Sequence, residues 1–516
     1  MQKICLINPG YDLEDTKANR LYIDSGYNTP SLGLGYLASY LEKNGFYIDI
    51  IECMMEDIGY NRLIDIVNKN KYNIVGLSIC DQTRKHAFKI VKLLEKNFPT
   101  LNVIVGGYAP TLSYESILKT LPFVKCCILG EGEETFLEIV RKLDSNQEID
   151  MVEGIAYLKN NNVKKNNKRD LIQNLDKLPF PKRKVINERK VLNIISSRGC
   201  INSCTYCSIS AFYKSCKGEK FRYRSAENVI NEIYHYIAKY GRPDKITFYD
   251  DNFLSNEKLN LQNIEKLCPI LKEINIPFCI TTRAQDIVIN YKLVEELKKA
   301  GLCHLFVGIE TFSQRQLDLY NKNTTTEVNL KALSILDKLD ITVEIGFIPF
   351  DVSTTLEEIQ YNFEILKNSK YKNIIYKTGK IFSENCYVMA VNGTQYRNLL
   401  IKENKYFNNN RGYIFDEYKV EYLFLCLSKW NDILSEIKSK MYMVFEVNKY
   451  NNIYNEIYEL NKSLTILDID FVIELCKSIR NNKEFLYCYN LFKVKIENIK
   501  YKYLYLENKI NENGYE

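Results

Sequence analysis

The stretch Ser196-Ser-Arg-Gly-Cys200-Ile-Asn-Ser-Cys204-Thr-Tyr-Cys207 directly follows an apolar run, residues 192–196, that is typical of a β-strand. It places three of the chain's 16 cysteines in a C-x3-C-x2-C pattern on one short loop. Three thiolates on such a loop can bind three irons of a 4Fe-4S cluster and leave the fourth iron without a protein ligand. Cys200, Cys204 and Cys207 are therefore the predicted cluster ligands, and the open iron can bind a substrate or cofactor.

A zinc site is the alternative that these cysteines allow. A structural zinc ion takes four Cys or His ligands in a tetrahedron, and Cys216 is the only further candidate within about 15 residues of the loop. The spacing therefore favours the cluster over a closed zinc site.

Length and composition narrow the class of protein. The chain has 516 residues, too many for one ordinary domain, and its 46% hydrophobic and 26% charged residues are typical of a globular protein. A net charge of +6, from 70 Lys+Arg and 64 Asp+Glu, is too dilute to indicate a nucleic-acid-binding protein. The N-terminus lacks a signal-peptide pattern, and no apolar run approaches the roughly 18 residues of a membrane helix. We expect a cytoplasmic protein with reduced thiols.

Residues 1–150 alternate short apolar runs with amphipathic helical patterns. The expected strands are 3–8, 47–52, 74–79, 102–106 and 126–129, and the expected helices are 33–44, 62–69, 83–98, 113–121 and 135–143. This order predicts a doubly wound, Rossmann-like α/β domain, with its ligand at the carboxyl ends of the strands.

Three further regions follow. Residues 151–190 are rich in Asn and Lys and contain Leu178-Pro-Phe-Pro181, which predicts a hairpin or linker. Residues 191–398 return to α/β alternation, with strands expected at 192–196, 245–249, 278–282, 305–309, 342–347 and 373–378. Six such units predict a partial (β/α)6 barrel of the TIM type, with its site at the carboxyl ends of the strands. Residues 399–516 are predicted to be helical, because apolar residues recur at helical spacing over 418–445 and 453–479.

The cysteine loop, with Tyr206 before its last cysteine, closely resembles the cluster motif of radical S-adenosylmethionine (SAM) enzymes. The resemblance implies that SAM chelates the open iron, and that the cluster, reduced by an external donor of the flavodoxin or ferredoxin type, cleaves SAM to a 5′-deoxyadenosyl radical. It further implies SAM contacts at the loop and strand ends, for which the candidates are Tyr206, Asp250, Asp251, Arg283, Glu310, Gly346 and Ile348. Each strand-end residue alone could equally be a cap or a surface ion pair.

The N-terminal domain resembles the cobalamin-binding domain that precedes the barrel in one large radical SAM subclass. The motifs that carry this resemblance are Leu6-Ile-Asn-Pro9, Pro30-Ser-Leu-Gly-Leu-Gly-Tyr-Leu37, Val75-Gly-Leu-Ser78, Val105-Gly-Gly107 and Gly130-Glu-Gly-Glu133. Glycines after strands let the backbone approach a large flat ligand. The candidate cobalamin-binding residues are Asn8, Pro30, Leu32, Gly33, Ser78, Gly106, Gly107, Gly130, Glu131 and Gly132. The alternative is a doubly wound domain without cobalamin, in which the glycines serve only tight turns.

The chain has three histidines, His86, His235 and His304. None lies in the Asp-x-His-x-x-Gly pattern with which many cobalamin proteins supply a lower ligand to cobalt. The resemblance therefore implies cobalamin bound without a histidine lower ligand, as is usual in this subclass. His86 is expected at the surface of a helix.

Together the two resemblances imply a cobalamin-dependent radical SAM enzyme. The first hypothesis is a methyltransferase that acts on an unactivated carbon through a 5′-deoxyadenosyl radical and methylcobalamin. The second is a non-methylating cyclisation, rearrangement or redox step, with cobalamin assisting or absent. The near-neutral charge suits a small-molecule, lipid or peptide substrate, and no motif chooses among these or identifies a catalytic residue.

Two other classes fit less well. A methylthiotransferase would need a second cluster on N-terminal cysteines, and Cys5, Cys53 and Cys80 do not lie in that family's surroundings. An electron-transfer or cluster-scaffold protein fits poorly, because it would not need the carboxylates that the sequence places at the strand ends.

Overall fold

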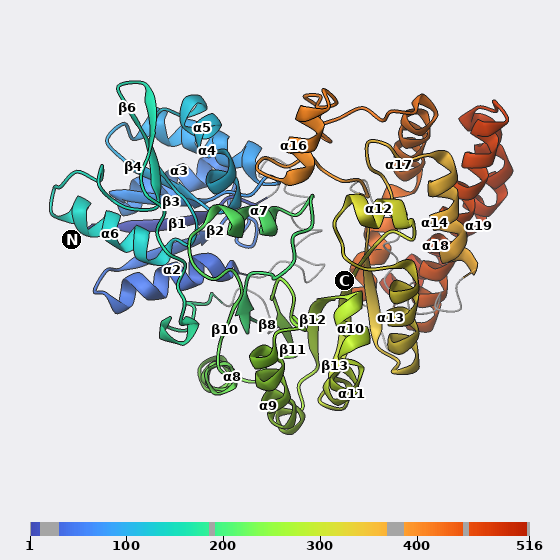
Figure 1. Ribbon diagram of the computed structural model, residues 1–516, viewed down its shortest axis with the longest axis horizontal. Helices are drawn as coiled ribbons and strands as arrows, with labels where there is room; N and C mark the ends of the chain where they lie inside the picture. The colour runs from blue at the N-terminus through green and yellow to red at the C-terminus, as the bar shows by residue number, and fades with distance from the viewer. Residues whose placement is uncertain (1, 11–29, 185–190, 369–385, 447–453, 513–516) are drawn as a thin grey trace.

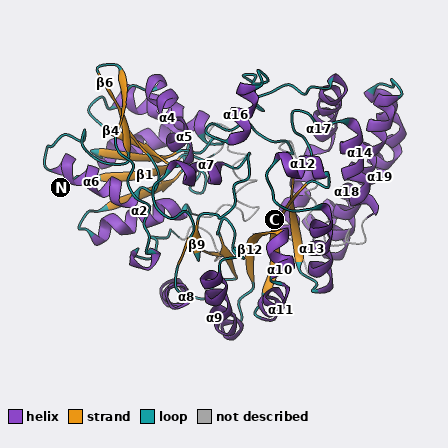
Figure 2. Ribbon diagram, in the orientation of Figure 1, coloured by secondary structure: helices purple, strands orange, loops and turns teal. Residues whose placement is uncertain are grey.

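The computed structural model describes residues 2–10, 30–184, 191–368, 386–446 and 454–512. The N-terminal α/β region, a second α/β region and a helical C-terminal region follow one another across the molecule (Figure 1). Helices flank the strands of both sheets (Figure 2).

The N-terminal sheet has the strand order β2-β1-β3-β4-β5-β6-β7, and its first five strands are parallel. The strands are β1 (Ile4–Asn8), β2 (Ile48–Glu52), β3 (Ile74–Ser78), β4 (Asn102–Gly106), β5 (Val124–Ile128), β6 (Ile155–Lys159) and β7 (Asn162–Lys165). The helices are α2 (Leu32–Lys43), α3 (Tyr60–Asn70), α4 (Arg84–Asn97), α5 (Tyr108–Thr120) and α6 (Glu133–Asp144). Separate apolar clusters pack on the two faces of the sheet, which confirms the doubly wound prediction.

Helix α5 begins five residues earlier than the sequence pattern predicts. Gly107, at φ +105°, lets the chain turn from β4 directly into the helix, because an added Cβ would lie 2.9 Å from the carbonyl oxygen of Ile79. Ser113 interrupts the helix with φ −140°, and the apolar periodicity is regular only after it.

Within the stretch 151–190, which was predicted to be a hairpin or linker, residues 155–165 form two strands of the first sheet. β6 pairs antiparallel with β5, and β7 pairs antiparallel with β6. Asn160 and Asn161 adopt φ +52° and +60°, the left-handed pair that a tight two-residue hairpin requires. The outer strand, β7, carries the exposed side chains of Lys164 and Lys165.

The second sheet has five parallel strands in the order β14-β13-β12-β11-β8. They are β8 (Val191–Ile194), β11 (Lys245–Phe248), β12 (Phe278–Arg283), β13 (Leu302–Glu310) and β14 (Thr342–Phe347). Its helices are α8 (Ala226–Tyr240), α9 (Lys258–Ile274), α10 (Ala284–Ile289), α11 (Tyr291–Lys299), α12 (Gln314–Leu319), α13 (Thr326–Lys338) and α14 (Leu356–Asn368). Five strands of the predicted partial barrel are therefore present, and the sixth, expected at 373–378, lies outside the described residues.

Two short elements connect the sheets. β9 (Ser197–Arg198) pairs antiparallel with β10 (Arg222–Tyr223) beyond the end of β8. Helix α7 (Ser208–Ser215) begins directly after the third cysteine of the loop and packs against α5. The cysteine loop therefore lies between β9 and α7, next to the N-terminal domain.

The C-terminal region is helical, as predicted. It contains α16 (Gln395–Lys402), α17 (Tyr418–Glu446), α18 (Tyr454–Arg480) and α19 (Phe485–Glu512), and α18 packs against α14 of the barrel. Trp430 stacks on Phe471 with 3.6 Å between ring centroids and donates its indole N–H to Asp468 at 2.8 Å. These helices share one hydrophobic core with the barrel.

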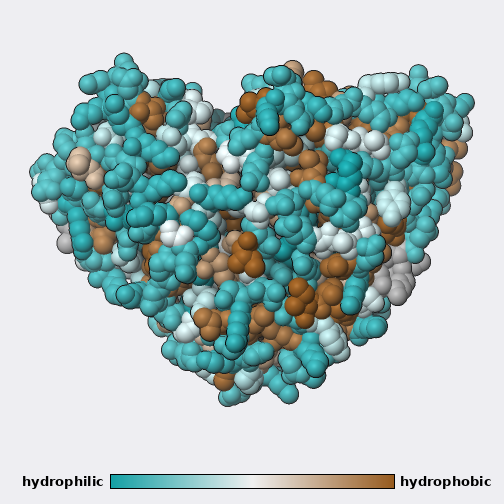
Figure 3. Space-filling model, viewed as in Figure 1, coloured by the Kyte–Doolittle hydropathy of each residue, from teal (hydrophilic) through white to brown (hydrophobic). Residues whose placement is uncertain are grey.

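The visible surface is largely hydrophilic, with scattered apolar patches (Figure 3). Among the described residues, no helix is both long enough and apolar enough to cross a membrane.

Candidate active site

The cysteine loop starts from a glycine that no other residue could replace without distortion. Gly199 has φ +91°, and an added Cβ would lie 1.8 Å from the carbonyl oxygen of Lys220. Its N–H donates a hydrogen bond to Oδ2 of Asp251 at 3.0 Å. The first cluster cysteine, Cys200, is thereby fixed beside the carboxyl end of β11.

The second half of the loop is anchored to the segment after β13. Thr205 donates its N–H to the carbonyl of Tyr320 and its hydroxyl to that of Leu319, both at 2.9 Å. The Asn321 amide donates to the carbonyl of Ser203 at 3.0 Å. The loop is thus held at both ends over the carboxyl ends of the barrel strands.

The three thiols are half-buried and lie close enough to influence one another electrostatically. Burial raises the pKa of Cys200, and it raises the pKa of Cys207 to about 11. The Asn202 amide donates to Sγ of Cys200 at 3.4 Å. Iron binding would have to displace the thiol protons, as metals generally do at cysteine sites.

The donor set fits a cluster better than a single ion. In the part of the chain that the structure describes, no group of three His, Cys, Asp or Glu side chains could hold one metal ion. A 4Fe-4S cubane instead takes each of three thiolates on a different iron, so the thiols need not converge on one point. The loop geometry is thus compatible with the cluster.

The two adjacent acids after β11 have different surroundings. Asp250 is buried and accepts hydrogen bonds from the Ser196 N–H at 3.1 Å and from the hydroxyls of Ser196 and Ser197 at 2.8 and 2.5 Å. Its carboxylate therefore holds the turn between β8 and β9. Asp251 lines a cavity, so it is the better placed of the two for contact with a cofactor.

Asp251 should make stability depend on pH. Burial raises its pKa to about 6, above the unfolded value of about 3.9. The folded chain therefore binds this proton more tightly, and the resulting stability, fully present below about pH 4, is lost as pH rises through 6. We expect Asp251→Asn to raise the free energy of unfolding of the cluster-free protein by about 3 kcal/mol at pH 7.5 and to have little effect at pH 4. Urea unfolding at both pH values measures this, and equal effects would contradict it.

Glu310, Arg283 and Tyr206 meet at the carboxyl ends of β12 and β13. Glu310 has φ +66° and forms an ion pair with Lys322. The Arg283 guanidinium donates to Oδ1 of Asn202 and to the carbonyl of Lys322. Its buried Nε has no hydrogen-bond partner among the described residues. Burial, followed by the charge of Glu310, raises the pKa of the Tyr206 hydroxyl. An unpaired buried donor beside an ion pair is suited to a polar ligand.

Gly346 and Ile348 frame this group. An added Cβ at Gly346 would lie 3.1 Å from the Phe306 ring and 3.3 Å from Oε2 of Glu310. The Ile348 N–H donates to the carbonyl of Glu310 at 2.7 Å. Lys322 was not predicted from the sequence, because it lies in a loop after α12 and has no distinctive spacing or strand position.

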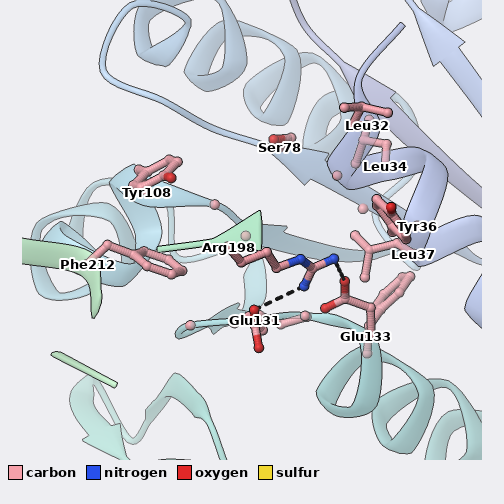
Figure 4. Close-up of a pocket in the computed structure, with 18 of the residues that line it drawn as sticks. Leu32, Leu34, Tyr36, Leu37, Ser78, Tyr108, Glu131, Glu133, Arg198 and Phe212 are labelled. Atoms are coloured by element: carbon pink, nitrogen blue, oxygen red, sulfur yellow. Dashed lines mark hydrogen bonds and ion pairs between the residues drawn. The ribbon is translucent and has the colours of Figure 1, made fainter. Parts of the chain in front are cut away.

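A cavity of about 290 Å³ lies at the carboxyl edge of the first sheet (Figure 4). Eight of the ten candidate cobalamin-binding residues line it: Leu32, Gly33, Ser78, Gly106, Gly107, Gly130, Glu131 and Gly132. Asn8 and Pro30 do not line it, and the Asn8 amide instead donates to Oε2 of Glu52 at 2.8 Å. The opposite wall comes from the second domain: Ile195, Ser197, Arg198, Phe212, Tyr213, Tyr249 and Asp251.

Arg198, which sequence analysis also missed, joins the two domains at this cavity. It donates to Oε1 of Glu131 at 3.0 Å and to Oε1 of Glu133 at 2.7 Å (Figure 4), and its guanidinium carbon lies 5.0 Å from the ring centroid of Tyr36. Arg222 also donates to Glu131, at 2.9 Å. Burial alone would raise the pKa of Glu131, but Arg198 and Arg222 hold it below its usual value.

The prediction for His86 was wrong. Its side chain is 6% exposed, and Nδ1 lies 2.6 Å from the Tyr60 hydroxyl. Among the residues that the structure describes, no histidine lines the cavity.

Comparison with known families identifies both α/β regions. A model of the B12 binding domain matches residues 21–140, and a model of the radical SAM superfamily matches residues 194–375. The chain belongs to the radical SAM enzymes that carry an N-terminal B12-binding domain, which confirms the resemblance.

Relatives share most of the chain. An uncharacterized methyltransferase of Pyrococcus horikoshii is 28% identical over 349 residues, 66% of this chain and 74% of the relative. The anaerobic magnesium-protoporphyrin IX monomethyl ester cyclase of Rubrivivax gelatinosus is 26% identical over 356 residues, 66% of this chain and 62% of the relative. The solved structure of the cobalamin-dependent radical SAM enzyme OxsB, with aqua-cobalamin and SAM bound, has a TM-score of 0.76 at 21% identity and covers 99% of this chain and 80% of its own.

Proposed function

We propose that this chain is a cobalamin-dependent radical SAM methyltransferase that acts on an unactivated carbon. The observation that carries the proposal is the cavity bounded by both domains. Asp251 lines that cavity, and its carboxylate also holds Gly199 next to Cys200, so a ligand in the cavity would lie beside the cluster loop. Bound cobalamin would supply a methyl group, and SAM on the reduced 4Fe-4S cluster would supply the radical that takes hydrogen from the substrate carbon.

The residues after β12 and β13 would hold SAM. Lys322 and Arg283 offer cations for its carboxylate, and Glu310 offers an anion for its ammonium group. Gly346 leaves room beside Glu310 that a side chain would fill. Glu310 and Lys322 are buried, which restricts water around them and strengthens their charge interactions.

The cavity would hold cobalamin by its walls and not through an imidazole. Its lining combines apolar side chains such as Leu32 and Leu37 with glycine backbone from Gly106 and Gly130, which suits a large flat ring. Gly130, at φ +90°, lies so close to Cys216 that an added Cβ would be 3.1 Å from its Sγ. We infer that cobalt has no histidine lower ligand from this chain.

The names of the relatives support two outcomes. The Pyrococcus relative is named a methyltransferase, and the Rubrivivax relative is named a cyclase at similar identity. A non-methylating cyclisation or rearrangement on the same cofactors is therefore the second candidate. In both cases we propose a small-molecule, lipid or peptide substrate and an external flavodoxin-type or ferredoxin-type reductant.

Anaerobic reconstitution with iron, sulfide, hydroxocobalamin and SAM separates these candidates. For a methyltransferase we expect about four irons per chain, one bound cobalamin, and formation of both S-adenosylhomocysteine and 5′-deoxyadenosine after reduction. Iron analysis, absorption spectra and mass spectrometry of the products measure this.

Each other result has a definite meaning. Formation of 5′-deoxyadenosine without S-adenosylhomocysteine would support the second candidate. Absence of bound cobalamin would refute the methyltransferase and leave the non-methylating reaction without cobalamin. About eight irons per chain would indicate a methylthiotransferase with a second cluster.

A further inference from the structure

The last helix of the C-terminal region, α19, carries a stripe of exposed apolar side chains. One side of the helix packs against α17 and α18, and Figure 1 shows α19 at the outer edge of the molecule. On the other side, large hydrophobic side chains are exposed, among them Val494 at 72% and Tyr501 at 74%. Contiguous exposed apolar side chains of this kind mark a surface that binds a partner.

The stripe has the spacing of a coiled coil. Its members recur at alternating intervals of four and three residues: Tyr487, Leu491, Val494, Asn498, Tyr501 and Tyr505. In a heptad, Leu491, Asn498 and Tyr505 occupy position a, and the other three occupy position d. From residue 487 to residue 505 the stripe is about 27 Å long. Such a seam is complementary to a second helix with the same pattern.

The buried residues of α19 lie on the opposite side of the helix from the stripe. Phe492, Ile499 and Leu506 are buried at position b of the same heptad. Ile496 and Tyr503 are buried at position f. Two molecules joined along their stripes would therefore keep their bodies on opposite sides of the seam. Because α19 is already folded, this association would not cost the entropy of ordering a helix.

The charged residues beside the stripe favour a second copy of α19 in parallel orientation. Glu497 occupies position g, and Lys502, five residues later, occupies position e. In a parallel pair, position g of one helix lies beside position e five residues on in the other. Glu497 would thus meet Lys502 of the second copy, and the two-fold axis makes this pair twice. Both side chains are exposed, and within the chain Glu497 lies 3.6 Å from Lys500 in a surface pair that contributes little.

An antiparallel pair would be less favourable. With the stripes fully overlapped, it would place Asn498 against Val494 and Glu497 beside Glu497 of the second copy. The buried asparagine would then lack a hydrogen-bond partner, and two like charges would face each other. A parallel pair instead places Asn498 against Asn498, and paired asparagines at position a favour a two-stranded coiled coil in a fixed register.

We propose that this chain forms a two-fold dimer in which the α19 helices of two copies pack in parallel along the stripe. Glu497 of each copy pairs with Lys502 of the other, and the two Asn498 side chains meet in the seam. The described residues that line the cofactor cavity all belong to the first two regions of the chain, so the dimer does not depend on the proposed function.

The first test measures the mass of the anaerobically reconstituted full chain by light scattering after size exclusion, over a range of loading concentrations. We expect twice the mass of one chain, falling towards a single chain on dilution. Val494→Asp should give only monomer, because it places two carboxylates against each other in an apolar seam. The free energy of unfolding of the monomer should not fall, because the Val494 side chain is 72% exposed.

Charge reversals test the parallel register. Glu497→Lys and Lys502→Glu should each raise the dimer dissociation constant about tenfold, because each variant replaces two attractive pairs by two repulsive ones. An equal mixture of the two variants should form a heterodimer about as tight as the wild-type dimer, since every 497–502 pair again has opposite charges. Lys493→Glu changes an exposed residue at position c, away from the seam, and should leave the dissociation constant unchanged.

Three results would overturn the proposal. The first is a wild-type chain that is monomeric at every concentration. The second is tighter association of Lys502→Glu, or a mixture of the two charge variants that is no tighter than either variant alone. The third is a monomer that binds phosphatidylglycerol vesicles and loses this binding in Val494→Asp, which would assign the stripe to a lipid surface.

Discussion

Replacing Cys204 by alanine is expected to abolish cluster binding and SAM cleavage. Two thiolates would remain, and a loop built for three does not hold a stable cluster. Bound iron should fall from about four per chain to near zero, and 5′-deoxyadenosine should fall below detection. The loop itself should survive, because Cys204 contributes its backbone carbonyl, 3.2 Å from the Cys207 nitrogen, and that group is unchanged.

The control for this variant is Cys216→Ala. Cys216 is the next cysteine in the sequence, and its side chain is buried beside Gly130. Among the described contacts, it makes none of the hydrogen bonds that hold the loop to the barrel. This variant should bind iron normally and cleave SAM. Retained cleavage by Cys204→Ala would refute the cluster assignment, and loss of iron from Cys216→Ala would show that the thiol at 216 takes part.

Arg198→Met should lower the free energy of unfolding more than the substitution of a surface residue does. The substitution keeps an apolar stem but leaves Glu133 without its ion pair and Glu131 with Arg222 alone. Removing one partner of a buried ion pair costs about 3–5 kcal/mol. Because the same groups line the cavity, we also expect bound cobalamin per chain to fall. Urea unfolding and absorption spectra of the reconstituted protein measure the two effects.

Arg84→Met provides the matched control. Arg84 lies 3.5 Å from Asp81, and both side chains are about a quarter to a third exposed, at 28% and 30%. Such pairs contribute at most about 1 kcal/mol, so this variant should unfold near the wild-type urea concentration and keep its cobalamin. An Arg198→Met variant as stable as Arg84→Met would show that the buried pairs do not hold the domains together.

The sequence was most informative where one local pattern determines the structure. β4 was predicted at its observed bounds, because an apolar run followed by glycines specifies a buried strand and the turn after it. The cysteine loop could also be predicted from the sequence, because its three cysteines lie within a stretch of eight residues. Helix α5 was predicted too short, because its first turn depends on the positive φ of Gly107 and has no regular apolar period.

Contacts between residues that are far apart in the sequence could not be predicted from the sequence. Arg198 meets Glu131 from 67 residues away in sequence, and nothing near either residue signals the pairing. Lys322 reaches Glu310 because the chain turns back after α12, which no periodicity predicts. Glu131, selected as a cofactor residue from its glycine-rich motif, lines the cavity but also binds two arginines of the barrel. Charge pairs that join domains emerge only once the domains are placed.

The outermost strand of the N-terminal sheet has a consequence for the behaviour of the protein in concentrated solution. β7 ends the sheet with exposed Lys164 and Lys165 on four residues. An open strand edge can recruit an extended segment of another chain, and short, lysine-bearing edges discourage such pairing. The hairpin therefore keeps neighbouring molecules from adding strands to this edge, which should favour dispersed molecules over sheet-linked aggregates.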